Sequence, residues 1–239
     1  MMMRIAERSP RVLARMAGVT QLLEAVTAGS VQMFILGNLV VNGNAAATAA
    51  NILGHERLFW LGFALSLAGV AFHIAWALLM HELLKPVNRT LSLFAAFVIL
   101  VGCAIQALSS LFYVAPLLVL KGGDSLSAFT AEHLQALAAI FLKLNTYAFD
   151  IYLVFFGFWC VLIGYLIFKS TFLPRVLGVL LAISGLGWMT YLYPPLANRM
   201  WHFIAAASAL GEIPLELWLI VIGVNTRRWN EKSSASRSN

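Results

Sequence analysis

The sequence carries very little charge, and its few charged residues are unevenly spaced. Only 11% of the 239 residues are Asp, Glu, Lys or Arg, whereas 61% are hydrophobic. Three runs contain none of these charged residues: 90–120, 151–168 and 176–198. Soluble domains typically have about 25% charged residues, so this composition excludes an ordinary soluble protein. Each run is close to, or longer than, the ~20 residues that a helix needs to cross the hydrocarbon core of a bilayer.

Several chemical signatures are also missing. The chain has two cysteines, Cys103 and Cys160, and both fall in apolar runs without histidine neighbours, which argues against a zinc site. No Ser–His–Asp order, His-Glu-x-x-His motif, phosphate-binding loop or dinucleotide fingerprint occurs in a suitable context. The sequence therefore identifies no reaction, no cofactor and no metal.

The apolar runs predict an all-α integral membrane protein with six transmembrane helices. Backbone groups in hydrocarbon must be hydrogen-bonded within their own segment, so each span is expected to be helical. The six predicted spans are 14–40, 58–84, 91–118, 145–169, 175–193 and 202–225. They form a single predicted domain over residues 1–230.

The segments outside the spans predict two short outer helices and a tail. Residues 42–57 predict a short surface helix. Residues 125–144 have an amphipathic pattern, so they either lie on the membrane or extend the fourth span outward. The polar residues 231–239 predict a disordered tail.

The distribution of lysine and arginine predicts the orientation. If the N-terminus is cytoplasmic, the inner segments hold Arg4, Arg8, Arg11, Arg15, Lys85, Arg89, Lys169, Arg175, Arg227, Arg228, Lys232 and Arg237. The outer segments then hold only Arg57, Lys121, Lys143 and Arg199. This bias predicts that both termini are cytoplasmic. The net charge of +6 then indicates contact with anionic lipid of the bilayer rather than with nucleic acid, because no basic soluble domain is present.

Two acidic residues in the sixth span are the strongest local signal. Glu212 and Glu216 lie one turn apart on one helix face, roughly 15–20 Å from the start of the span at 1.5 Å per residue. Pro214 lies between them and is expected to kink the helix and free the carbonyl of Leu210. Such an element resembles the cation sites of transporters. Equally, both acids could be neutral and hydrogen-bonded, so that they only hold helices together.

The other spans also carry polar residues at membrane depth. The candidate ligand- or cation-binding residues are Glu24, His73, Gln106, Asp150, Glu212 and Glu216. In the third span Gln106, Ser109, Ser110 and Tyr113 share one face by helical spacing. Because exposing such residues to lipid is costly, Glu24, Gln106, Glu212 and Glu216 are expected to face one another. A lone histidine such as His73 is more often a packing residue than a ligand.

Several short motifs resemble a known bacterial membrane family, domain of unknown function 4386. They are Phe155-Phe156-Gly157, Gly164-Tyr165-Leu166-Ile167, Phe172 to Gly178, Ala46 to Ile52 with Glu56, Leu58 and Phe59, Lys85 to Arg89, Glu216 to Leu219, and Gly223-Val224-Asn225. The resemblance covers nearly the whole chain. It implies a bacterial inner-membrane protein, and it supplies no activity and no catalytic residue.

Together these features favour a non-catalytic or transport-related protein whose buried acids bind protons, cations or a small ligand. The alternative is an intramembrane metal-dependent enzyme in which His73 and buried carboxylates hold zinc, iron or manganese. The oligomeric state stays open.

Overall fold

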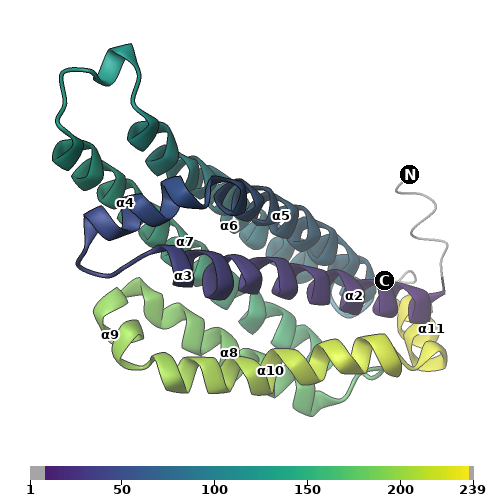
Figure 1. Ribbon diagram of the computed structural model, residues 1–239. Coiled ribbons are helices and arrows are strands. Elements are labelled where there is room, and N and C mark those ends of the chain that lie inside the picture. The colour runs from purple at the N-terminus through teal and green to yellow at the C-terminus, as the bar shows by residue number, and fades with distance from the viewer. Residues whose placement is uncertain (1–8, 237–239) are drawn as a thin grey trace. The chain divides into compact units, whose positions relative to one another are not determined.

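The computed structural model describes residues 9–236, and the regular secondary structure in this range is entirely helical (Figure 1). Six helical segments are long and apolar enough to cross a membrane, which confirms the predicted fold class. Their bounds are Pro10–Leu39, Glu56–Leu84, Arg89–Lys121, Ala131–Lys169, Arg175–Leu192 and Pro194–Val221. The predicted cytoplasmic residues Arg4, Arg8 and Arg237 lie outside the described residues.

Some of these segments consist of more than one element. The first comprises α2 (Pro10–Gly29), a π-helix η1 (Ser30–Leu36) and α3 (Gly37–Leu39). The next three are α5 (Glu56–Leu84), α6 (Arg89–Lys121) and α7 (Ala131–Lys169). The last two are α8 (Arg175–Met189) with the 3₁₀ turn η3 (Thr190–Leu192), and α9 (Pro194–Arg199) with α10 (Trp201–Val221).

The short elements agree with two sequence predictions. The predicted surface helix is α4 (Ala45–Gly54), whose first turn is capped by Asn44, because the Asn44 side chain accepts a hydrogen bond from the Ala47 amide. Of the two alternatives for residues 125–144, extension of the fourth span is the one observed, since α7 begins at Ala131 and continues without interruption to Lys169. A single 3₁₀ turn, η2 (Asp124–Leu126), precedes it.

Residues 231–235 of the expected tail are helical in the structure, and disorder of the tail as a whole stays a prediction. These residues belong to α11 (Thr226–Ala235). The Asn225 side chain caps the helix by accepting a hydrogen bond from the Arg228 amide, and Arg227 pairs with Glu231 one turn later. Trp229 also donates its indole hydrogen to the Leu83 carbonyl, at 2.9 Å. These contacts hold α11 in place although it has few apolar residues. Residues 237–239 lie outside the described residues.

The described residues form two compact units. Unit 1 contains the chain up to Leu22, Phe72–Cys103 and the chain from Asp150 onward, and unit 2 contains Leu23–Ala71 and Ala104–Phe149. Four spanning segments contribute residues to both units. The single domain expected over residues 1–230 stays a prediction.

A seam of glycines packs α7 against α8 in unit 1. A methyl group at Gly157 would lie 2.6 Å from the carbonyl oxygen of Gly185, and one at Gly164 would lie 2.5 Å from the carbonyl oxygen of Gly178. Contacts this short leave no room for a side chain, so the two backbones touch directly. Small residues at helix contacts are a common device in membrane bundles because they allow close approach.

The helices α8 and α10 also pack closely in unit 1, and Figure 1 shows them side by side. A methyl group at Gly211 of α10 would lie 2.6 Å from the carbonyl oxygen of Leu180. Gly178 and Gly211 thus both lie where a neighbouring helix approaches closely. This contact brings the polar faces of α8 and α10 together.

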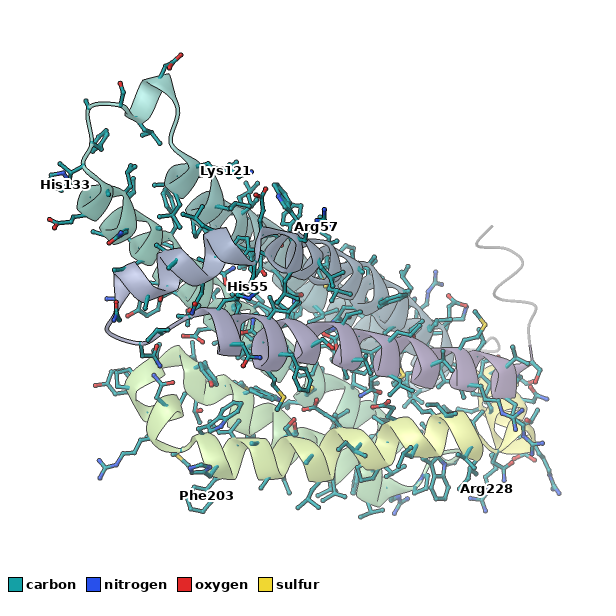
Figure 2. All side chains as sticks on the ribbon, in the orientation of Figure 1. His55, Arg57, Lys121, His133, Phe203 and Arg228 are labelled. Atoms are coloured by element: carbon teal, nitrogen blue, oxygen red, sulfur yellow. The ribbon has the colours of Figure 1, made fainter. Side chains whose placement is uncertain are left out.

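Apolar side chains cover much of the outer surface of the helices. Phe203 on α10 is 73% exposed and points away from its helix in Figure 2, and Met33, Leu192 and Val221 are similarly exposed. A soluble protein rarely exposes so many large apolar side chains. This surface fits contact with the bilayer.

The interior of unit 2 combines an apolar cluster with a stacked aromatic pair. The cluster consists of Val31, Ile35, Leu39, Ile52, Phe59, Tyr113, Leu117 and Leu142. The Phe59 and Tyr113 rings stack with centroids 4.6 Å apart. In the same unit Lys121, labelled in Figure 2, forms an ion pair with Glu56. The stacking on Phe59 holds the Tyr113 ring at the edge of a small polar pocket.

Candidate functional site

The Glu212 carboxylate lies at the contact between α8 and α10, and one of its oxygens accepts three hydrogen bonds. The donors to Oε1 are the Ser184 hydroxyl at 2.6 Å, the Trp188 indole N–H at 2.8 Å and the Ser208 hydroxyl at 2.8 Å. Ser184 and Trp188 are one turn apart on α8, and Ser208 is one turn before Glu212 on α10. Helical spacing places Ser184 and Trp188 on one face of α8, and the packing of α8 against α10 brings both to the carboxylate.

All three donors are neutral groups. Together they join this carboxylate oxygen to α8 and to the preceding turn of α10.

Glu216, one turn after Glu212, is buried at 6% exposure on the same helix. The helix α2 approaches it closely, since a methyl group at Gly18 would lie 3.0 Å from the Glu216 carbonyl oxygen. Pro214 lies inside α10 between the two acids. Because proline has no N–H, the Leu210 carbonyl lacks its usual helical partner. α10 continues as an α-helix through Pro214, and the kink and the binding role of the two acids stay predictions.

His73 occupies an aromatic cluster in unit 1. Its Nδ1 lies 3.0 Å from the Tyr152 hydroxyl, and the rings of Trp76, Phe156 and Trp159 lie with centroids 5.1–5.8 Å from its own. The imidazole is fully buried. This surrounding favours the packing interpretation of His73, because aromatic rings supply no ligand set for a metal.

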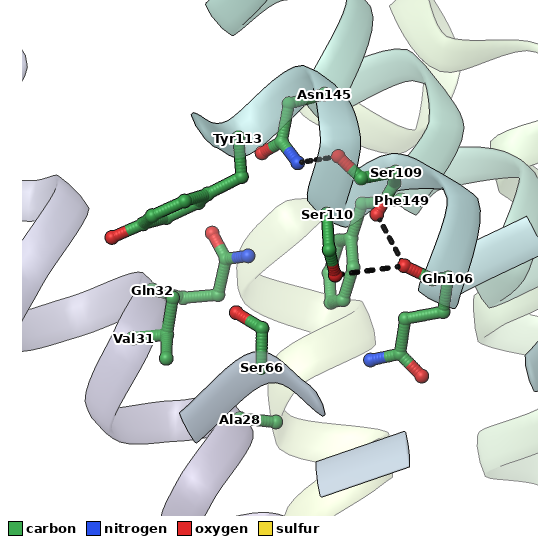
Figure 3. A pocket seen from close by; sticks show the side chains of 10 residues that line it. All are labelled: Ala28, Val31, Gln32, Ser66, Gln106, Ser109, Ser110, Tyr113, Asn145 and Phe149. Atoms are coloured by element: carbon green, nitrogen blue, oxygen red, sulfur yellow. Dashed lines mark hydrogen bonds between the residues drawn. The ribbon is translucent and has the colours of Figure 1, made fainter. Parts of the chain in front are cut away.

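Gln106 lies in unit 2, in a small polar pocket shown in Figure 3. The residues lining the pocket are Ala28, Val31, Gln32, Ser66, Gln106, Ser109, Ser110, Tyr113, Asn145 and Phe149. The four α6 residues predicted to share one face are all among them. The polar residues predicted to share one face of the third span therefore all line this pocket.

The six candidate residues are divided between the two units. His73, Asp150, Glu212 and Glu216 belong to unit 1, whereas Glu24 and Gln106 belong to unit 2. Asp150 is buried on α7, and Glu24 is half-buried on α2 and does not line the pocket of Gln106. The mutual facing of Glu24, Gln106, Glu212 and Glu216 stays a prediction. Within residues 9–236, no group of three or more His, Cys, Asp or Glu side chains could hold a metal ion.

Some residues of these sites were not singled out from the sequence. Trp188 and Ser208 bind Glu212, Tyr152 binds His73, and Gln32 and Asn145 line the unit 2 pocket. Ser208 could have been found, because it is four residues before Glu212 on one helix face. Trp188 could not, since only the packing of α8 against α10 brings its indole to the carboxylate.

The architecture and the buried acids define a multi-pass helical membrane protein. The family described as Domain of unknown function (DUF4386) matches residues 16–223, and the chain belongs to this family. No curated protein and no solved structure matches the chain. The family resemblance predicted from the short motifs is thus confirmed.

Proposed function

We propose that this protein is transport-related and that Glu212 is its proton- or cation-binding group. The observation that carries this proposal is the cradle of three donors, Ser184, Trp188 and Ser208, around one carboxylate oxygen. Ionisable residues within spans are rare and mark ion pathways and proton relays in membrane proteins.

The neighbouring residues supply the other parts of such a site. Glu216 is a second buried acid one turn away, and Pro214 interrupts the hydrogen bonding of α10 between them. Two acids in a low dielectric do not both ionise without a compensating cation, so uptake of a proton or cation changes the charge of the pair. Interrupted helices are also the elements that move or bind ions in transporters. The alternative of a metal-dependent enzyme has no cluster of ligands within the described residues to support it.

Infrared difference spectroscopy tests proton binding at Glu212. A pH step applied to the purified protein is expected to produce a C=O stretching band from a protonated carboxyl group. This band should be absent in Glu212→Gln, because an amide cannot take up the proton. The matched control is Glu231→Gln, which alters an exposed acid paired with Arg227 on α11. An unchanged band in Glu212→Gln would assign the titrating group elsewhere and refute the proposal.

We further propose that the protein resides in the cytoplasmic membrane of a bacterium with both termini inside. The support is the lysine and arginine bias of the sequence together with the family resemblance. In this orientation Arg227 and Arg228 of α11 lie at the anionic inner leaflet and favour binding to its lipids.

Reporter fusions test this orientation. A fusion at Asn239 should report a cytoplasmic location, and a fusion after Asp124 should report the opposite side of the membrane. The six spans place an odd number of crossings between these two points. An inner signal at Asp124 together with an outer signal at Asn239 would overturn the orientation.

A further inference from the structure

An open pocket lies in unit 1, where the first spanning segment begins and the last one ends. It is lined by Arg11 of α2, by Phe172 in the turn between α7 and α8, and by the stretch from Trp218 of α10 to Arg227 of α11. Figure 1 shows the beginning of α2 beside α11. The pocket has a volume of about 440 Å³, within the range of about 300–1,000 Å³ that is usual for ligand sites. It therefore has room for a group much larger than a single ion.

The turn after α10 holds Arg11 at the edge of this pocket. Gly223 has a φ of +74°, a conformation that favours glycine. A methyl group at Gly223 would lie 3.1 Å from Cγ of Arg11 and 3.8 Å from Cβ of Ala14, so α2 packs directly against the turn. The Asn225 amide donates a hydrogen bond to the Phe172 carbonyl at 3.1 Å. The walls of the pocket are thus joined to one another by backbone contacts.

The pocket is positively charged. Arg11 and Arg227 line it, and no acidic side chain among the described residues does so. Within residues 9–236, Arg11 forms no ion pair. Arg227 uses its Nε for the pair with Glu231, which leaves its two terminal nitrogens as donors for another group. Because guanidinium groups bind phosphate through parallel hydrogen bonds, two of them beside one pocket fit a phosphate group.

The rest of the lining is apolar and lies next to the lipid-facing surface. Trp218 belongs to the last turn of α10, and Ile222 follows the end of the spanning segment at Val221. Ile222 is 51% exposed and Val221 is 67% exposed. The end of a span is also where the phosphate groups of a bilayer lie, and tryptophan is enriched there. A lipid is therefore a better match for this pocket than a soluble phosphate ester.

We propose that this pocket binds the headgroup of an anionic phospholipid. Arg11 and Arg227 hold the phosphate, and Trp218 and Ile222 contact the glycerol and the upper part of the chains. Basic pockets between spanning helices bind anionic headgroups in other membrane proteins. A lipid with an added ammonium group binds more weakly, because it brings a positive charge close to the two arginines. The site shares no residue with that of Glu212, and it depends neither on transport nor on the orientation of the chain.

Lipid titration of the purified full-length protein tests the site. A non-ionic detergent is used, so that no charged bilayer is present to attract the protein as a whole. Native mass spectrometry measures the dissociation constants of phosphatidylglycerol and of phosphatidylcholine with the same chains. Phosphatidylglycerol should bind several-fold more tightly. Arg11→Gln should weaken its binding about ten-fold, the effect of losing a charge-assisted hydrogen bond, and Arg227→Gln should act in the same direction.

The matched control is Arg15→Gln. It removes the same charge one turn further along α2, at an exposed residue that does not line the pocket, and it should leave the binding nearly unchanged. Equal losses in Arg11→Gln and Arg15→Gln, or equal binding of the two lipids, would overturn the proposal. Glycerophosphoglycerol, which is the same headgroup without chains, should not displace the lipid at equal concentration. Displacement would overturn the assignment to a lipid and identify a soluble phosphate ester as the ligand.

Discussion

Replacing Glu212 by glutamine should abolish proton- or cation-dependent flux through this protein while leaving its fold intact. Glutamine has the same shape, and its amide oxygen can still accept hydrogen bonds from Ser184, Trp188 and Ser208. It cannot carry the charge or release a proton. Reconstituted vesicles with a pH-sensitive dye inside measure the flux after a pH or cation gradient is applied. Melting temperature in detergent, measured in parallel, shows whether the fold persists.

Four further variants make this experiment decisive. Glu231→Gln changes an exposed acid on α11 and should leave the flux unchanged. Ser208→Ala removes one of the three donors and should reduce the flux only partly. Glu216→Gln should also abolish flux if the two acids act as a pair. If Glu216 is instead structural, Glu216→Gln is nearly silent and Glu216→Leu destabilises the protein, because polar partners lose their hydrogen bonds. Full flux in Glu212→Gln would refute a charge-dependent role for Glu212.

The largest loss of stability is expected for Gly178→Val at the contact between α7 and α8. A side chain there would collide with the Gly164 carbonyl oxygen, and its first carbon would lie 2.7 Å from the Phe168 amide nitrogen. Both neighbours are backbone atoms, which cannot rotate away. Overpacking by small additions typically costs about 1–3 kcal/mol, so a branched side chain should cost at least about 3 kcal/mol of unfolding free energy.

Thermal unfolding in detergent measures this effect. The matched control is Gly29→Val on α2, where nothing lies within 4 Å of the added carbon. Gly29→Val should change the melting temperature little, since valine is at least as compatible with a helix as glycine. Similar losses of stability in the two variants would contradict the close contact at Gly178, because they would show that a branched residue destabilises a span wherever it is placed.

The spans could be predicted from the sequence because a helix surrounded by lipid tolerates very few charged side chains. The third span, residues 91–118, lies wholly within α6 (Arg89–Lys121). The start of α7 was harder to predict, since the amphipathic residues 131–144 fit a surface helix and a spanning extension equally well. The helix at residues 226–235 could not be predicted, because capping by Asn225 and pairing of Arg227 with Glu231 leave no apolar signal in the sequence.

The candidate site was predictable only in part. The stripe of Gln106, Ser109, Ser110 and Tyr113 follows from helical spacing alone, and the structure places all four in one pocket. The donors of Glu212 on α8 do not follow from spacing, because they depend on how two helices pack. The π-helix η1 could not be predicted either, since its residues are ordinary apolar ones with one serine and one glutamine.

The glycine seam has a consequence for how chain length can vary. Gly164 pairs with Gly178 and Gly157 pairs with Gly185, so both pairs are centred on Thr171 in the turn between the helices. A residue gained or lost in that turn leaves both pairs in register with each other. A residue gained between Gly157 and Gly164 would rotate one of them by about 100° and lower it by about 1.5 Å, which separates the pairs. We therefore expect this hairpin to tolerate insertions and deletions in the turn at residues 170–174 but not between the two glycines of either helix.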